Sequence, residues 1–307
     1  MTVPCPTCGV QVTVPVQPAN YFVRHWRGEL PLGVSIWVNG LLLSMLLTVA
    51  TKALISMDDS FSLKVIAKLT LLLYATAIAG TVWQLVGIWR SALSYGGSSF
   101  RAMLAKIAVV IGLLHFLFLC YATYLPQSQN LVDIINGDRL LPPYEIRTLF
   151  GGTEVEFRGG IRAGCSEELE EALAAAPQAK VLRIESPGGR LAEAKKMIRL
   201  VRERDLITFT SEQCQSAAPL VLMAGRQRIV GVGARVGFHA GRLPGATAGQ
   251  VKEMADLVRS TMELAGVSEQ FISRVLATPP NQMWYPTFRE MLAAGVVTRQ
   301  SFGHAAP

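Results

Sequence analysis

The sequence has 307 residues, of which 50% are hydrophobic and 17% are charged, and its formal net charge is +7. That length has room for about two domains, and the hydrophobic excess is typical of a membrane protein rather than of an ordinary soluble one. The charge does not indicate nucleic-acid binding, because the excess of Lys and Arg lies in the first 125 residues: 8 against 3 Asp and Glu there, and 21 against 19 in the remainder.

The first segment of the chain contains a paired-cysteine motif. Cys5 and Cys8 are separated by two residues and followed by Gly9, which is the spacing of one half of a zinc ribbon. A closed zinc site needs four ligands, and the one further candidate nearby is His25. The motif therefore predicts either a Zn site that a second chain completes or the remnant of one, in an N-terminal tail of residues 1–29.

Residues 30–125 contain three long stretches without a charge. These stretches are residues 30–51, 69–89 and 107–125, and each is long enough to cross a hydrocarbon layer of about 30 Å as a helix. Buried core helices are the alternative, but such helices are seldom this long and apolar on all sides. The region is therefore predicted to be an all-α membrane region with three transmembrane helices in a lipid bilayer.

Basic residues around these stretches predict their orientation. Arg24 and Arg27 precede the first stretch, whereas Arg90, Arg101 and Lys106 lie around the loop between the second and the third. Cytoplasmic loops are enriched in Lys and Arg, so the N-terminus and this loop are expected in the cytoplasm. Three crossings then place the C-terminal region on the other side, which for a bacterial inner membrane is the periplasm.

The rest of the chain divides into a linker and a globular domain. Residues 126–150 contain prolines and polar side chains, which is typical of a linker. In residues 151–307 short apolar segments alternate with amphipathic ones, which indicates an α/β domain with a largely parallel sheet. We expect strands at residues 155–158, 180–185, 206–210, 228–232 and 235–239, and helices at residues 166–175, 191–204, 217–224, 248–264, 268–275 and 288–293.

Three short motifs in this domain contain residues suited to acyl transfer. They are ESPGG at residues 185–189, CQSAA at residues 214–218 and GFH at residues 237–239. Gly188 and Gly189 lack a Cβ, so their backbone N–H groups can approach a developing oxyanion. Ser216 is expected at a helix N-terminus as a nucleophile, with His239 as its base. Taken singly, the motifs also fit a Pro-Gly turn, a helix cap and a core histidine.

Together, the order and spacing of these motifs resemble the superfamily of the Clp protease proteolytic subunit and signal peptide peptidase A. The chain is similar in particular to a group of bacterial periplasmic proteins whose serine lies in a Cys-x-Ser-Ala context, and the resemblance covers residues 154–298. It implies a ClpP/crotonase-like fold, a stack of ββα units, and assembly into a homo-oligomer. It also implies that Ser216 is the nucleophile, that His239 is the general base, and that the Ala217 N–H joins the glycine turn as an oxyanion donor.

The third catalytic position departs from this resemblance. The acid of the family falls just before the final helix, where this chain reads PPNQMW at residues 279–284 and has no carboxylate. Asn281 is the best match, and an amide can orient an imidazole although it cannot stabilise imidazolium by charge. Glu290, Asp256 and Glu263 are alternatives from elsewhere in the fold. The working hypothesis is a Ser-His pair oriented by Asn281.

Two hypotheses of different classes follow. The first is a membrane-anchored serine peptidase that acts on a peptide or protein substrate and needs no cofactor for catalysis. The second is a catalytically degenerate scaffold or peptide-binding membrane protein, which the missing carboxylate favours. A third, a thioester-handling enzyme of the related crotonase fold, has no adenine-binding signature to support it. The presence of Ser216, His239 and both glycines favours the first.

Overall fold

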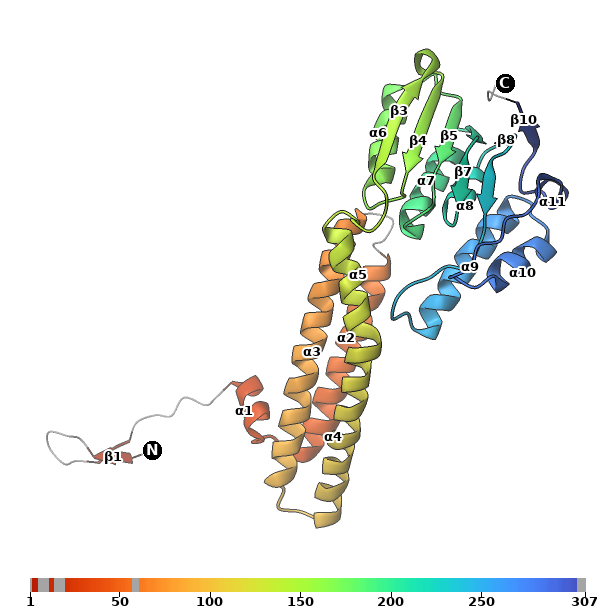
Figure 1. The fold of residues 1–307 in the computed structure, drawn as a ribbon. Helices are drawn as coiled ribbons and strands as arrows, with labels where there is room; N and C mark the ends of the chain where they lie inside the picture. The colour runs from red at the N-terminus through yellow and green to blue at the C-terminus, as the bar shows by residue number, and fades with distance from the viewer. Residues whose placement is uncertain (1, 5–10, 14–19, 57–60, 303–307) are drawn as a thin grey trace. The chain divides into compact units, whose positions relative to one another are not determined.

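The computed structural model describes residues 2–4, 11–13, 20–56 and 61–302 (Figure 1). By its internal contacts the chain forms two compact units. The first contains residues 1–52 and 73–119, and the second contains residues 53–72 and 120–307. The residues expected at the catalytic site all lie in the second unit.

Helices form most of the N-terminal part of the chain. Three helical stretches of the described residues are long and apolar enough to cross a membrane, namely Val34–Leu54, Leu63–Leu93 and Ser99–Ile135. They contain nearly all of the three predicted spans, which supports an association with a membrane. The elements here are β1 (Thr2–Pro4), β2 (Gln11–Thr13), α1 (Tyr21–Arg27), the π-helical η1 (Val34–Val38), α2 (Asn39–Ser56), α3 (Leu63–Leu93) and α4 (Ser99–Leu119).

The second unit is built on a six-stranded sheet of order β10-β8-β6-β5-β4-β3. β3 runs antiparallel to β4, and the other neighbours are parallel. A separate parallel pair joins β7 to β9. This topology confirms the predicted α/β class, whereas a stack of ββα units is not confirmed. The strands are β3 (Tyr144–Leu149), β4 (Glu154–Gly159), β5 (Val181–Glu185), β6 (Ile207–Thr210), β7 (Gln213–Gln215), β8 (Arg228–Gly231), β9 (Arg235–Gly237) and β10 (Arg299–Ser301).

Helices bury one face of this sheet. Phe157 of β4 and Ile184 of β5 are fully buried in a core cluster to which Leu169 of α6 and Val201 of α7 also belong. Alternate residues of a strand point to opposite faces, so the apolar residues of β4 and β5 collect on the side of the helices. The helices of this unit are α6 (Cys165–Ala175), α7 (Leu191–Glu203), α8 (Ala218–Leu222), α9 (Ala248–Leu264), α10 (Glu269–Ala277) and α11 (Phe288–Ala293), with the 3₁₀ turn η3 (Phe150–Gly152).

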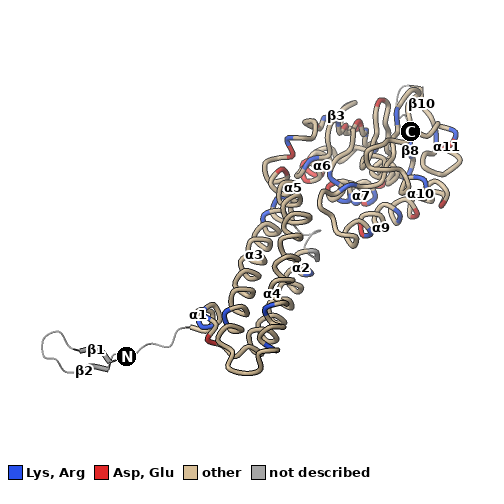
Figure 2. The backbone as a smooth tube through the Cα atoms, turned by 60° about the horizontal axis from the view of Figure 1, so that its bottom comes forward, with Lys and Arg blue, Asp and Glu red and all other residues tan. Residues whose placement is uncertain are grey.

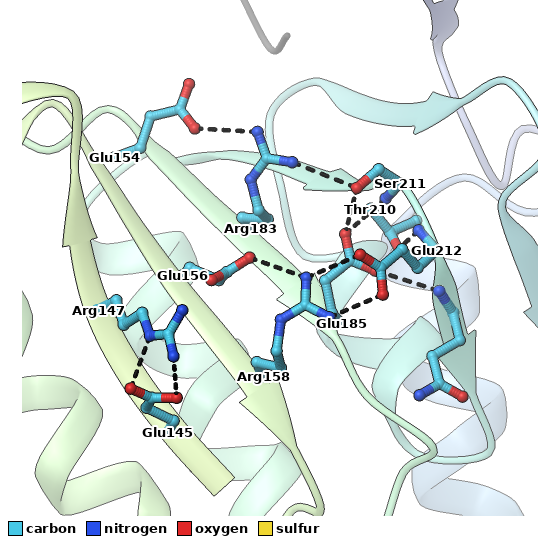
Figure 3. Close-up of polar contacts among 11 residues, drawn as sticks. Glu145, Arg147, Glu154, Glu156, Arg158, Arg183, Glu185, Thr210, Ser211 and Glu212 are labelled. Atoms are coloured by element: carbon cyan, nitrogen blue, oxygen red, sulfur yellow. Dashed lines mark hydrogen bonds and ion pairs between the residues drawn. The ribbon is translucent and has the colours of Figure 1, made fainter. Parts of the chain in front are cut away.

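The opposite face of β4 and β5 carries charged side chains that pair across the strands (Figure 3). Arg183 Nη2 lies 3.5 Å from Glu154 Oε2, and Arg158 Nη1 lies 2.7 Å from Glu212 Oε2. Arg158 also reaches Glu156 at 3.3 Å. Apolar and charged residues alternate along β4 and in the second half of β5, a pattern typical of strands with one apolar face.

The segment expected as a linker, residues 126–150, contains regular structure. The chain continues from α4 through the π-helical η2 (Cys120–Tyr124) into α5 (Leu125–Ile135), and β3 follows. Pro126 is the second residue of α5 and directly follows the π-helical η2, and the helical stretch continues past it. Gln127 and Ile134 of α5 are buried, so this helix belongs to the folded unit rather than to a free connection.

Candidate active site

Ser216 lies in the sharp turn between β7 and α8. Its φ is +60°, a left-handed conformation that a residue with a side chain seldom adopts. The backbone N–H of Ser216 donates to the carbonyl of Gly237 at 3.0 Å, which ties the turn to β9. The turn directs the Ser216 side chain into a pocket that His239 also lines. Strained backbone that its surroundings hold in place is typical of functional sites.

His239 follows β9 and meets the serine directly. His239 Nε2 lies 2.8 Å from Ser216 Oγ, and His239 Nδ1 lies 2.7 Å from the carbonyl oxygen of Ala240. Since a carbonyl can accept but not donate, Nδ1 carries a hydrogen in this contact. In the neutral ring Nε2 is then the acceptor, which is the tautomer that a base for Ser216 requires.

The glycine turn lies against the serine from the other side. A Cβ at Gly188 would lie 2.6 Å from Ser216 Cβ, and one at Gly189 would lie 2.3 Å from the Ile161 carbonyl oxygen, so neither position has room for a side chain. Their φ values of +94° and +151° also favour glycine. This close approach brings the backbone of the turn next to Ser216.

The amide groups of this turn differ in their bonding. The Gly188 N–H donates to Ser186 Oγ at 3.0 Å and is therefore engaged. Within the described chain the N–H groups of Gly189 and Ala217 have no protein acceptor, and both residues line the pocket with Ser216 and His239. Gly188 was predicted as an oxyanion donor beside Gly189 and Ala217, but its N–H is bonded to Ser186 Oγ, so the geometry leaves Gly189 and Ala217 as the candidate donors, and their role stays a prediction.

The pocket itself has a volume of about 280 Å³ and a mainly apolar wall. Its charged side chains are Arg190 and Arg242, and among the described residues no Asp or Glu lines it. Arg190 is paired with Asp133 and Asp138, whereas Arg242 is exposed. The apolar lining residues are Leu63, Ile134, Leu191, Ala192, Leu220, Phe238, Leu243, Met254, Val258 and Val275.

Glu185 supports the site and was not singled out from the sequence. Its carboxylate is 1% exposed and accepts hydrogen bonds from the backbone N–H groups of Ser211, Glu212 and Gln213 at 2.7–3.1 Å. The hydroxyls of Ser211 and Thr210 donate to it as well (Figure 3). Because β7 begins at Gln213, this carboxylate fixes the strand that ends at Gln215, directly before Ser216. Glu185 could have been identified from the sequence as a charged residue at the end of an apolar strand, next to the SPGG turn.

The structure does not bring Asn281 to His239. Asn281 is exposed, and in the described residues its side chain makes no hydrogen bond. The alternative carboxylates are engaged elsewhere or exposed: Glu290 accepts from the Thr287 N–H at 2.7 Å, Glu263 pairs with Arg259, and Asp256 lies exposed on α9. The Ala240 carbonyl occupies the position at Nδ1 where a carboxylate was sought. A catalytic role for Asn281 stays a prediction.

The predicted metal site lies outside the described residues, because Cys5 and Cys8 are not among them. His25 is fully buried in the first unit, where Asn39 Nδ2 lies 3.0 Å from its Nδ1. In the described part of the chain no three His, Cys, Asp or Glu residues are grouped as metal ligands. Cys165 and Cys214 are both free and buried, and burial raises the pKa of each thiol. Zinc binding at Cys5 and Cys8 stays a prediction.

Comparison with known proteins finds a likeness among solved structures. No family model matches the chain, and no curated protein matches it. Among solved structures, the chain resembles the crystal structure of the ClpP protease catalytic domain from Plasmodium falciparum, with 16% sequence identity and a TM-score of 0.39. The likeness covers 50% of this chain and 85% of that one. It concerns the fold, and the chemistry proposed below depends on the site geometry.

Proposed function

We propose that this chain is a membrane-anchored serine hydrolase that cleaves peptide bonds. The observation that carries the proposal is the 2.8 Å contact between Ser216 Oγ and His239 Nε2 at a left-handed turn. Two backbone N–H groups that have no acceptor among the described residues, those of Gly189 and Ala217, line the same pocket. Nucleophile, base and oxyanion donors are the parts that acyl transfer needs.

The first chemical step forms an acyl-enzyme. Ser216 Oγ attacks the substrate carbonyl carbon while its proton passes to His239 Nε2, and the electron pair of the C=O bond moves to oxygen. The Gly189 and Ala217 N–H groups stabilise this oxyanion, and one such donor contributes about 3–4 kcal/mol to catalysis. The intermediate then collapses: the C–N bond breaks, and the leaving amine takes the proton from Nε2.

The second step returns the free enzyme. Water attacks the ester carbonyl carbon, gives a proton to His239 Nε2, and forms a second oxyanion at the same donors. Breaking the ester C–O bond releases the acid and returns the proton to Ser216 Oγ. Throughout both steps the Ala240 carbonyl accepts the Nδ1 hydrogen and keeps the ring in its orientation. A carbonyl dipole stabilises imidazolium less than a carboxylate charge does, so we expect slow turnover.

The wall of the pocket supports a preference for apolar substrate side chains. Leucine, valine, methionine and phenylalanine side chains line the space beside Ser216, and a volume of about 280 Å³ accommodates one large side chain of the same kind. Burial of such a side chain contributes about 1.5–3 kcal/mol, enough to rank substrates by the residue next to the cleaved bond.

Attachment to a bilayer, a periplasmic site and assembly into a homo-oligomer belong to the same proposal. The three long apolar helices support the attachment, and the basic residues near them support a cytoplasmic N-terminus. A phosphatase that is active only in the periplasm, fused to the C-terminus, is expected to be active. Activity of a cytoplasm-specific reporter at that position would reverse the orientation, and a monomeric mass in detergent would contradict the oligomer.

Labelling with a fluorophosphonate tests the chemistry. We expect the full chain in detergent to be labelled at Ser216, and Ser216→Ala and His239→Ala to lose labelling by about three orders of magnitude or more. Ser260→Ala, which removes an exposed serine of α9, is the matched control and is expected to label normally. If the folded full chain takes no label, the hydrolase proposal is overturned. The alternative, a catalytically degenerate scaffold, is then favoured, in line with the missing carboxylate.

A further inference from the structure

The helix α5 contacts both walls of the proposed catalytic pocket. It is the last part of the apolar helical stretch Ser99–Ile135, and its residues Asn130 and Ile134 line the pocket. Gln127, Asn130 and Ile134 follow one another at intervals of three and four residues, so they share one face of the helix. That face lies against the loops that carry the glycine turn and the base.

On one wall, α5 is joined to the residue that follows Gly189. The Arg190 guanidinium donates to Asn130 Oδ1 at 2.5 Å and to Asp133 Oδ2 at 3.1 Å, both on α5. Its Nε donates to Asp138 Oδ1 at 2.8 Å, and Asp138 is fully buried. The backbone N–H of Arg190 donates to the Ile161 carbonyl at 2.8 Å. Charge-assisted bonds of this kind hold the backbone beside the Gly189 N–H.

On the other wall, α5 is joined to the loop that follows His239. Gln127 is 5% exposed, and its Nε2 donates to the Gly245 carbonyl at 2.9 Å and to Gln250 Oε1 at 3.0 Å. A Cβ at Gly245 would lie 2.6 Å from Pro126 Cγ, so the loop lies directly on α5. Ala240, whose carbonyl orients His239, lies five residues before Gly245 in the same loop.

We propose that α5 is a positioning element of the active site, with Gln127 and Asp133 as its positioning residues. By holding both loops, it keeps the oxyanion donor Gly189 and the base His239 at the distance from Ser216 that acylation needs. The inference depends on the proposed hydrolase function. If α5 has this role, the catalytic unit begins with α5, at the end of the third apolar helix. Residues 151–307 alone then lack α5 and with it part of their site.

Two substitutions test this in the full chain in detergent. Gln127→Ala removes the bonds to the loop after His239, and its matched control is Gln129→Ala, an exposed glutamine of the same helix for which the structure shows no side-chain bond. Asp133→Asn weakens the hold on Arg190, and Asp133 is not itself a residue of the pocket wall. Its control is Arg199→Gln, which removes an exposed charge on α7.

The measurement is the rate of fluorophosphonate labelling at Ser216 as a function of reagent concentration. It gives the affinity for the reagent and the maximal labelling rate separately, and it is made at a temperature well below the unfolding temperature. We expect each test variant to lower the maximal rate about tenfold with the reagent affinity within about twofold, because small displacements of catalytic groups have large effects on rate. Both controls should label like the wild type. Hydrogen exchange of the backbone at residues 240–247 should rise in Gln127→Ala.

The outcomes separate the two proposals. A wild type that takes no label overturns the hydrolase function and this inference with it. A labelled wild type, with test variants that label at the same rate and show unchanged exchange at residues 240–247, overturns the role of α5 alone. A lower unfolding temperature with an unchanged labelling rate of the folded protein shows a purely structural helix and also overturns it.

Discussion

The buried carboxylates of the second unit and His239, the proposed base, have different kinds of partner. Glu185 accepts bonds from three backbone N–H groups, and Glu193 accepts from the Gly164 and Ser166 N–H groups. Among the described residues, His239 has only the Ala240 carbonyl at Nδ1. The chain therefore uses buried negative charge to fix loops around the site, and it orients the base without charge. The orientation of the His239 ring is fixed by a backbone carbonyl, which stabilises imidazolium less than a carboxylate would.

Among the substitutions that test this comparison, Glu185→Gln is expected to have the largest effect, a loss of stability. An amide keeps the size of the side chain but presents its NH₂ group to backbone donors, so at least one buried N–H loses its acceptor. We expect the free energy of unfolding to fall by about 3 kcal/mol. The measurement is denaturant unfolding of the full chain in detergent. Glu212→Gln, which breaks an exposed pair with Arg158, should cost less than about 1 kcal/mol. Equal losses would show that burial of Glu185 does not matter.

The thiol of Cys214 reports on the same turn. Burial, with a smaller contribution from the Glu185 charge, raises the pKa of Cys214 well above its usual range. The thiolate is the reactive form, so iodoacetamide should modify Cys214 very slowly at pH 8. We expect Glu185→Gln to raise that rate about tenfold by opening the turn. Cys165, buried elsewhere in the domain, is the internal control and should keep its rate. A parallel rise at Cys165 would indicate general unfolding instead.

A smaller effect is expected from two replacements of Ser216, the proposed nucleophile. Ser216→Ala and Ser216→Gly both remove the hydroxyl, but of the two only glycine adopts a φ of +60° without steric strain. The glycine variant should therefore be more stable than the alanine variant by about 1 kcal/mol. Thermal unfolding of the two inactive proteins measures the difference. If alanine proves as stable as glycine, the left-handed turn at Ser216 carries no strain.

The smallest effect is expected from Asn281→Ala. Because this side chain is exposed and has no bond to His239, we expect the labelling rate of Ser216 to stay within about twofold of the wild type. A tenfold loss would restore Asn281 as the third catalytic residue, and the base would then be oriented by a side chain. Gln282→Ala, its exposed neighbour, is the matched control.

Much of the fold was predictable because it depends on side-chain patterns. The alternation of Val155 and Phe157 with charged neighbours identified β4, and long uncharged stretches identified the apolar helices. The helix α5 was missed because Pro126 and its polar residues look like a linker. Those polar residues bond to partners more than 50 residues away, as Gln127 does with Gly245, and such partners do not show in local composition.

The site was predictable only where it depends on side-chain identity. Ser216 and His239 were identified from their motifs, and the structure brings them together. The partner of His239 Nδ1 is a backbone carbonyl, which every residue has and no sequence pattern marks. In the same way, the engagement of the Gly188 N–H by Ser186 Oγ, which leaves Gly189 as the available donor, depends on the path of the backbone.

The pairing of β7 with β9 has a consequence for how the chain tolerates changes in length. Gln215 pairs with Gly237, so Ser216 comes one residue after one strand of a two-stranded ladder and His239 comes two residues after the other. A slip of one residue between these strands would shift Ser216 relative to His239 by about 3.3 Å. A residue inserted at Gly233, where a Cβ would meet nothing within 4 Å, can instead be accommodated in the turn before β9. Length variation among related chains should therefore collect in that turn and be absent from the ladder.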